Sequence, residues 1–143
     1  MNPPDDFVEK DVCGIGAPND AYARYFSGRS YLKPLNDPTV SGMLVANVTF
    51  EPGCRNNWHV HHAEEGGGQI LICTAGEGWY QEFGKPAVSL TPGTVITIPE
   101  GVKHWHGAKR DSWFSHIAVE VPGKGTRNEW LEPVNQNDYD RLE

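Results

Sequence analysis

The feature that most restricts the fold is a series of short apolar segments, each ended by a turn, between Gly42 and Val121. The turns recur about every 6–12 residues, a spacing typical of strands. The chain also holds 16 glycines and 11 prolines, which favour strands joined by turns over a helical bundle. The pattern predicts an all-β sandwich or barrel. Its expected strands are Met43–Phe50, Trp58–His62, Gln69–Ala75, Trp79–Phe83, Ala87–Leu90, Thr94–Ile98, Val102–Ala108 and Trp113–Val121.

The two ends of the chain lack this pattern. Residues 1–18, rich in proline, glycine and aspartate, predict an extended arm. A short helix is expected over Asn19–Phe26, a first strand over Ser30–Leu35, and a last short helix within Asn135–Leu142. Neither a repeat nor a linker interrupts the chain, so we expect one domain. Its parts are an N-terminal arm (1–41), a barrel core (42–121) and a C-terminal tail (122–143).

Composition argues against several classes of partner. Twelve Lys and Arg stand against 19 Asp and Glu, and the formal net charge of −7 comes with no basic run. Nucleic acid and anionic membranes are therefore not expected as partners. No apolar run approaches the roughly 20 residues of a membrane span. The acidic, proline-containing N-terminus and an odd count of three cysteines predict a cytoplasmic protein with free thiols.

Histidines are concentrated in two segments that suggest a metal site. His59 and His61 alternate in one expected strand, and His104 and His106 alternate in another. Side chains two residues apart on a strand share a face, so each pair can point into a barrel. Neutral imidazoles suit manganese, iron, cobalt, nickel, copper or zinc rather than magnesium or calcium. His62 points the other way and is expected to be incidental.

The two histidine segments resemble the two motifs of the cupin family. The first motif, G-x5-H-x-H-x3,4-E-x6-G, matches at Gly53, His59 and His61. The second, G-x5-P-x-G-x2-H-x3-N, matches at every position but the last, which is Ala108: Gly93, Pro99, Gly101 and His104. The resemblance covers about residues 42–121. It implies a double-stranded β-helix (jelly-roll barrel) with a divalent metal held by His59, His61 and His104.

The acidic ligand of the first motif has two possible counterparts. Counting forward from His61 reaches Glu65, whereas counting back from Gly76 reaches Gln69. We favour Gln69, because it opens a stiff strand, while Glu65 precedes three glycines that cannot hold a ligand firmly. A shell of three histidines and a glutamine is neutral, so the ion would keep its full charge and act as a stronger Lewis acid.

The sequence is also similar to the small bacterial cupins that include the manganese-dependent hydroxynitrile lyases and the carboxymuconolactone decarboxylase-associated cupins. The similarity lies in H-x-H, the later Gln69, the run Lys103–Ala108, and His116. It implies that His106 and His116 stand near the metal as proton-transfer groups. It also implies one divalent transition metal, manganese or iron first, with nickel, zinc and cobalt as alternatives. The loop between His61 and Gln69 is longer here.

These observations favour a metal-dependent enzyme with lyase-type chemistry on a small carbonyl or hydroxy compound. A Lewis-acid metal would polarise the substrate, and His106 and His116 would move a proton. Two alternatives stay open: a dioxygenase or isomerase, and a non-catalytic cupin whose metal binds a small ligand. Because related proteins commonly pair, a homodimer is expected, with the N-terminal arm adding a strand to a partner's sheet edge.

Overall fold

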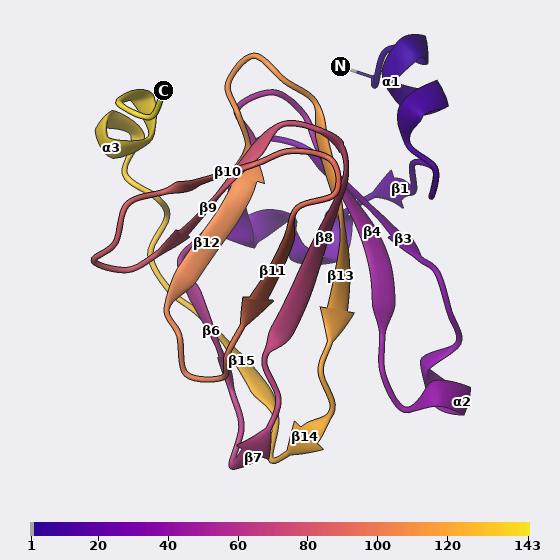
Figure 1. Ribbon diagram of the computed structural model, residues 1–143, viewed down its shortest axis with the longest axis vertical. Helices are drawn as coiled ribbons and strands as arrows, with labels where there is room; N and C mark the ends of the chain where they lie inside the picture. The colour runs from indigo at the N-terminus through magenta and orange to yellow at the C-terminus, as the bar shows by residue number, and fades with distance from the viewer. Residues whose placement is uncertain (1) are drawn as a thin grey trace.

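A computed structural model describes residues 2–143 and shows two antiparallel sheets curled face to face (Figure 1). The first sheet has the order β1–β3–β4–β13–β8–β11. Its strands are β1 (Ala17–Pro18), β3 (Ser30–Pro34), β4 (Val45–Phe50), β13 (Phe114–Glu120), β8 (Gln69–Gly76) and β11 (Val95–Ile98).

The second sheet has the order β10–β9–β12–β5–β2, and β6 joins it by pairing with both β12 and β15. Its strands are β10 (Val88–Leu90), β9 (Gly78–Glu82), β12 (His104–Ala108), β5 (Arg55–Asn56), β2 (Phe26–Ser27), β6 (His59–His62) and β15 (Arg127–Trp130). A small ribbon of β7 (Glu65–Gly66) and β14 (Gly123–Lys124) lies at one end of the barrel (Figure 1). The predicted all-β fold is confirmed.

The core forms between the sheets because apolar side chains alternate along the strands. In β8 every second residue is buried, from Gln69 through Leu71 and Cys73 to Ala75. Leu71 and Cys73 meet the two phenylalanines Phe50 and Phe114, which are fully buried, in the main core cluster. This cluster fills one part of the barrel and leaves the part near the start of β8 for polar side chains.

The N-terminal segment is not the extended arm that the sequence predicted. It contains helix α1 (Asp5–Lys10), and Phe7 of this helix packs against Trp113 in a small apolar cluster. Strand β1 then pairs with β3 of the same chain. Acidic residues in the first turn of α1 and a lysine in its last turn favour the helix, a signal that the proline and glycine content obscured.

The segments around the core differ from prediction in detail. Asp20–Tyr25 form a 3-10 helix (η1) where a short helix was expected, and Pro38–Ser41 form an unpredicted helix α2. The expected C-terminal helix is present as α3 (Gln136–Asp140), with the Asn135 side chain accepting hydrogen bonds from two backbone amides of its first turn. The tail also supplies β14 and β15, which the sequence reading missed because their residues are polar.

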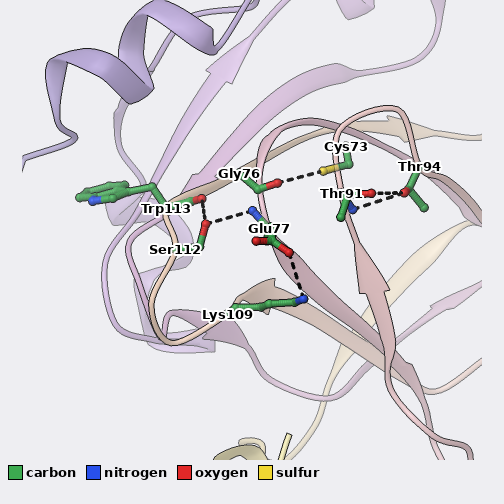
Figure 2. Close-up of polar contacts among 8 residues, drawn as sticks. All are labelled: Cys73, Gly76, Glu77, Thr91, Thr94, Lys109, Ser112 and Trp113. Carbon is green, nitrogen blue, oxygen red and sulfur yellow. Dashed lines mark hydrogen bonds and ion pairs between the residues drawn. The ribbon is translucent and has the colours of Figure 1, made fainter. Parts of the chain in front are cut away.

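Two loops close the end of the barrel where β8 finishes (Figure 2). The Glu77 backbone amide donates a hydrogen bond to Ser112 Oγ at 3.0 Å, and Lys109 Nζ lies 3.2 Å from Glu77 Oε1. These contacts tie the β8–β9 turn to the β12–β13 loop. Gln69 stands at the opposite end of β8, so the polar part of the barrel interior lies away from this closure.

Within residues 2–143 no helix is long and apolar enough to cross a bilayer. The α-helices of this part of the chain have four to six residues, far short of the roughly 20 that a span needs.

Candidate metal centre

Strands β6 and β12 bring three of the predicted ligands together. His59 and His104 are directly paired across the two strands, and their ring centroids lie 4.2 Å apart. The His61 ring lies 5.1 Å from the ring of His59 and 5.2 Å from that of His104. All three side chains are buried in the barrel interior. The alternation read from H-x-H therefore places the predicted histidines around one point.

His106 is also close to this point. Ligand nitrogens of His59, His104 and His106 all lie within 4.8 Å of one another, a group that fits a metal site. His61 was predicted as the third histidine ligand, and this closest group contains His106 in its place. The four rings form one continuous cluster, because the His59 and His106 centroids are 5.5 Å apart.

Hydrogen bonds fix which ring nitrogen of each histidine faces the cluster. The Nδ1 atoms of His59 and His104 lie 2.8 and 2.9 Å from the backbone carbonyls of Asn57 and Val102. A carbonyl oxygen only accepts, so each Nδ1 carries the proton and each Nε2 keeps its lone pair. In the same way His61 Nδ1 donates to Asn128 Oδ1 at 2.7 Å. Such outer partners are typical of metal-ligating histidines.

Several atoms of the site are buried without a protein partner. Among the residues that the structure describes, His61 Nε2, His104 Nε2 and Gln69 Oε1 make no hydrogen bond. Buried polar atoms are normally satisfied, so such a group of acceptors calls for a partner. All of them are lone-pair donors of the kind that bind a transition metal. The residues present therefore fit a divalent metal, whose identity the donor set leaves open.

The fourth predicted ligand, Gln69, lies in the buried first position of β8. Glu65, the alternative, is exposed in strand β7, where it pairs with Lys124 of β14. We therefore expect Gln69→Ala to lower the bound metal clearly and Glu65→Ala to leave it near the wild-type level. Metal content of the two purified variants, measured by plasma mass spectrometry, checks this. A loss seen only in Glu65→Ala would contradict the choice of Gln69.

His106 and His116, the predicted proton-transfer groups, are in direct contact. His116 Nε2 lies 2.9 Å from His106 Nδ1, so the two rings share one proton in this bond. Asn56 Oδ1 accepts from the His106 backbone amide at 2.9 Å, which directs its Nδ2 at the His106 ring, 3.2 Å from Nε2. A register shift in β13 between Ser115 and His116 accompanies the inward position of His116.

Burial holds these imidazoles in the neutral form. Desolvation lowers the pKa of both His104 and His116 to about 4. The pKa of His59 and that of His106 lie well below the usual range, chiefly through burial, and neighbouring histidines lower both further. Phe50 packs on the His116 ring at 5.3 Å and contributes to this apolar setting. Neutral imidazoles are the form that binds a metal or accepts a proton.

The lowered pKa values predict an acid-sensitive fold in the metal-free protein. The unfolded chain protonates these histidines near pH 6.5, whereas the folded chain resists until about pH 4. The unfolded state thus binds more protons in this window, and stability is lost as the pH falls from 6.5 to 4. We expect the titration of His104 and that of His116 each to lower the free energy of unfolding by ~3 kcal/mol between pH 6.5 and pH 4. Urea unfolding of chelator-treated protein measures this, and a flat profile would contradict it.

The site opens into a cavity of about 360 Å³ between the two sheets. The aromatic residues of the lining are Tyr22, Phe26 and Trp130. The Trp130 ring lies 4.6 Å from the His59 ring and stacks on Tyr25. Aliphatic side chains also line the cavity: Leu32, Leu44, Ala46 and Val48. The cavity therefore suits a small molecule with an apolar part and an oxygen or nitrogen directed at the histidines.

Sequence reasoning missed four residues of this site: Asn56, Glu120, Asn128 and Trp130. Asn128 and Trp130 lie opposite His61 and His59 in the β15–β6 pairing. Their i, i+2 spacing was the available signal, but β15 itself was not predicted. His62, expected to be incidental, contacts Glu129 Oε1 at 2.8 Å and also lies in the cavity lining.

Comparison with known proteins agrees with the fold. The cupin domain family model matches residues 46–118. The (R)-mandelonitrile lyase of Granulicella tundricola is 37% identical over 129 residues, which cover 90% of this chain and 95% of that protein. The chain belongs to the cupin family, and the resemblance of its two motifs to those of cupins is confirmed.

Solved structures give the same result. The crystal structure of a cupin-like protein from Thermotoga maritima is 36% identical, with a TM-score of 0.78 over 92% of this chain and 96% of that one. A predicted oxalate decarboxylase from the same organism is 22% identical, with a TM-score of 0.64 over 75% of this chain and 92% of that one, and shares the fold. The predicted jelly-roll barrel is thus confirmed as an all-β cupin barrel.

Proposed function

We propose that this protein is a metal-dependent lyase that cleaves or forms a small cyanohydrin with an apolar, preferably aromatic, substituent. The observation that carries the proposal is the contact of His116 Nε2 with His106 Nδ1 at 2.9 Å. This pair lies beside the three-histidine group, in the lining of the cavity. The relative named (R)-mandelonitrile lyase, 37% identical over nearly the full chain, supports this substrate class.

We assign the metal to His59, His61, His104 and Gln69, with His106 outside the ligand set. Both ring nitrogens of His106 already contact polar atoms, Nε2 of Asn56 Nδ2 and Nδ1 of His116 Nε2. His61 Nε2, in contrast, is buried without a partner among residues 2–143. A divalent ion held there, manganese or iron in the first instance, would supply Lewis-acid polarisation of the substrate oxygen.

The His106–His116 pair would handle the protons. As the carbon–cyanide bond breaks, its electron pair leaves with the cyanide and the O–H electron pair forms the carbonyl bond. The hydroxyl proton passes to His106 Nε2, where the substrate hydroxyl takes the place of the 3.2 Å contact with Asn56 Nδ2. The bond to His116 Nε2 holds the His106 ring in place and spreads the acquired charge over two imidazoles. The same proton then returns to cyanide, so aldehyde and hydrogen cyanide leave and both histidines are neutral again.

The cavity walls would orient the substrate. Phe26 and Trp130, whose ring centroids lie 6.4 Å apart, both line the cavity and offer an apolar surface beside His59 against which an aromatic ring can pack. Val48 and Ala118 lie on the sheet that faces this wall.

Turnover of mandelonitrile tests the proposal. We expect the protein loaded with manganese or iron to release benzaldehyde, followed by its absorbance, and chelator treatment to remove the activity. Chiral chromatography of the reverse reaction, from benzaldehyde and cyanide, would show one enantiomer in excess. Absence of turnover in fully metal-loaded protein, together with tight binding of small carboxylates or alcohols, would instead support a non-catalytic binding cupin.

A further inference from the structure

One acidic residue of the cavity, Glu120, is used by neither the ligand set nor the proton pair. It lies on β13, directly opposite Gln69 of β8 in the sheet register. Glu120 Oε1 accepts a hydrogen bond from Gln69 Nε2 at 2.6 Å, and Glu120 Oε2 lies 4.0 Å from His61 Nδ1. The carboxylate therefore stands directly behind two of the side chains assigned to the metal.

This contact determines which end of the Gln69 amide faces the barrel interior. A carboxylate only accepts hydrogen bonds, so the amide must present its NH2 group to Glu120. The carbonyl oxygen is then turned away, and Gln69 Oε1 is indeed buried without a partner in the described part of the chain. Without Glu120 the amide could rotate and direct its NH2 group, which cannot bind a cation, at the same point.

Glu120 also changes the charge balance of the site. Three neutral histidines and a glutamine leave a divalent ion with its full charge inside a largely apolar barrel. A divalent ion held by Gln69 would have the Glu120 carboxylate one hydrogen bond behind that ligand. A negative charge there would favour a bound cation, to an extent that solvent reduces because the Glu120 side chain is 37% exposed.

We propose that Glu120 is a positioning residue that orients the Gln69 carbonyl toward the metal and thereby sets the metal affinity of the site. The inference rests on the metal site of the proposed function. The cupin motif places an acidic residue among the metal ligands. Here the acidic residue Glu120 would lie behind the ligand Gln69 and act on the metal through the hydrogen bond to its amide. Partners of this kind commonly change metal affinity by about 10–100-fold when removed.

Manganese affinity of Glu120→Ala tests this directly. Competition with a metal-binding dye should show affinity about 10–100-fold below that of the wild type. The melting temperature of the metal-free protein should change little, since the Glu120 side chain is 37% exposed. Glu129→Ala is the matched control, because Glu129 likewise accepts a side-chain hydrogen bond, but from His62, which is not a ligand. The metal affinity of Glu129→Ala should match that of the wild type. Equal affinity of Glu120→Ala and wild type overturns the inference.

Glu120→Gln separates orientation from charge, because its amide oxygen can still accept a hydrogen bond from Gln69 Nε2 while the negative charge is removed. We expect this variant to bind manganese about tenfold or more tightly than Glu120→Ala. Binding no tighter than that of Glu120→Ala counts against the inference. Failure of the wild type itself to bind a divalent metal would instead refute the metal site of the proposed function.

Discussion

Replacement of His104 by alanine is expected to abolish metal binding at stoichiometric concentrations, and with it the lyase activity. The His104 side chain is fully buried, and residue 104 pairs with residue His59 across strands β12 and β6. The Nε2 atom of His104 makes no hydrogen bond within residues 2–143. Loss of a direct ligand should exceed the 10–100-fold effect that is typical of an outer partner, so we expect affinity to fall by more than about 100-fold.

Metal content and turnover of His104→Ala, measured on the same sample, check this prediction. The matched control is His62→Ala, which removes a histidine of the same strand as His59 that contacts Glu129 and is not an assigned ligand. That variant should keep both metal and activity. Full metal occupancy in His104→Ala would mean that His104 is not a metal ligand.

The barrel could be predicted because its strands obey simple rules. Apolar runs such as Gln69–Ala75 are bounded by turn residues, and the observed strand β8 differs from that run by one residue. The ends of the chain could not be predicted in the same way. Helix α1 is stabilised in part by Phe7 packing on Trp113, a contact between residues about 100 positions apart that no local pattern reveals.

The same distinction applies to the site. The H-x-H spacing places His59 and His61 on one face from sequence alone, and the second motif supplies His104. The partners that give these rings their tautomers and orientation could not be found, because Asn128 reaches His61 from a strand of polar residues and Glu120 meets Gln69 across 51 positions of sequence. Local spacing thus predicts the candidate ligands, whereas the orientation of their side chains depends on the tertiary fold.

The two proposed tasks, metal binding and proton transfer, each draw residues from both sheets. His59, His61, His104 and His106 come from β6 and β12 in one sheet, whereas His116, Gln69 and Glu120 come from β13 and β8 in the other. The metal and the proton pair therefore both require that the sheets keep their relative position. The core around Phe50 and Phe114, which packs against His116, would therefore support the proposed site as well as the fold.

Replacement of His106 by alanine is expected to lower kcat/KM by about 100–10,000-fold, the range typical of a lost general acid–base group. His106 is the histidine that links the two halves of the site: its ring lies 5.5 Å from that of His59, and its Nδ1 contacts His116 Nε2. If its role is proton transfer, metal content should stay near the wild-type level while turnover is lost.

The comparison with His116→Ala makes this prediction sharper. His116 contacts His106 but is absent from the three-histidine group, so its removal should reduce kcat less than loss of His106 and leave the metal in place. Measurement of kcat, KM and metal content for both variants distinguishes the two roles of His106. Loss of metal in His106→Ala alone would place His106 in the ligand shell, as its distance to His59 and His104 also permits, and would shift the proton-transfer role to His116.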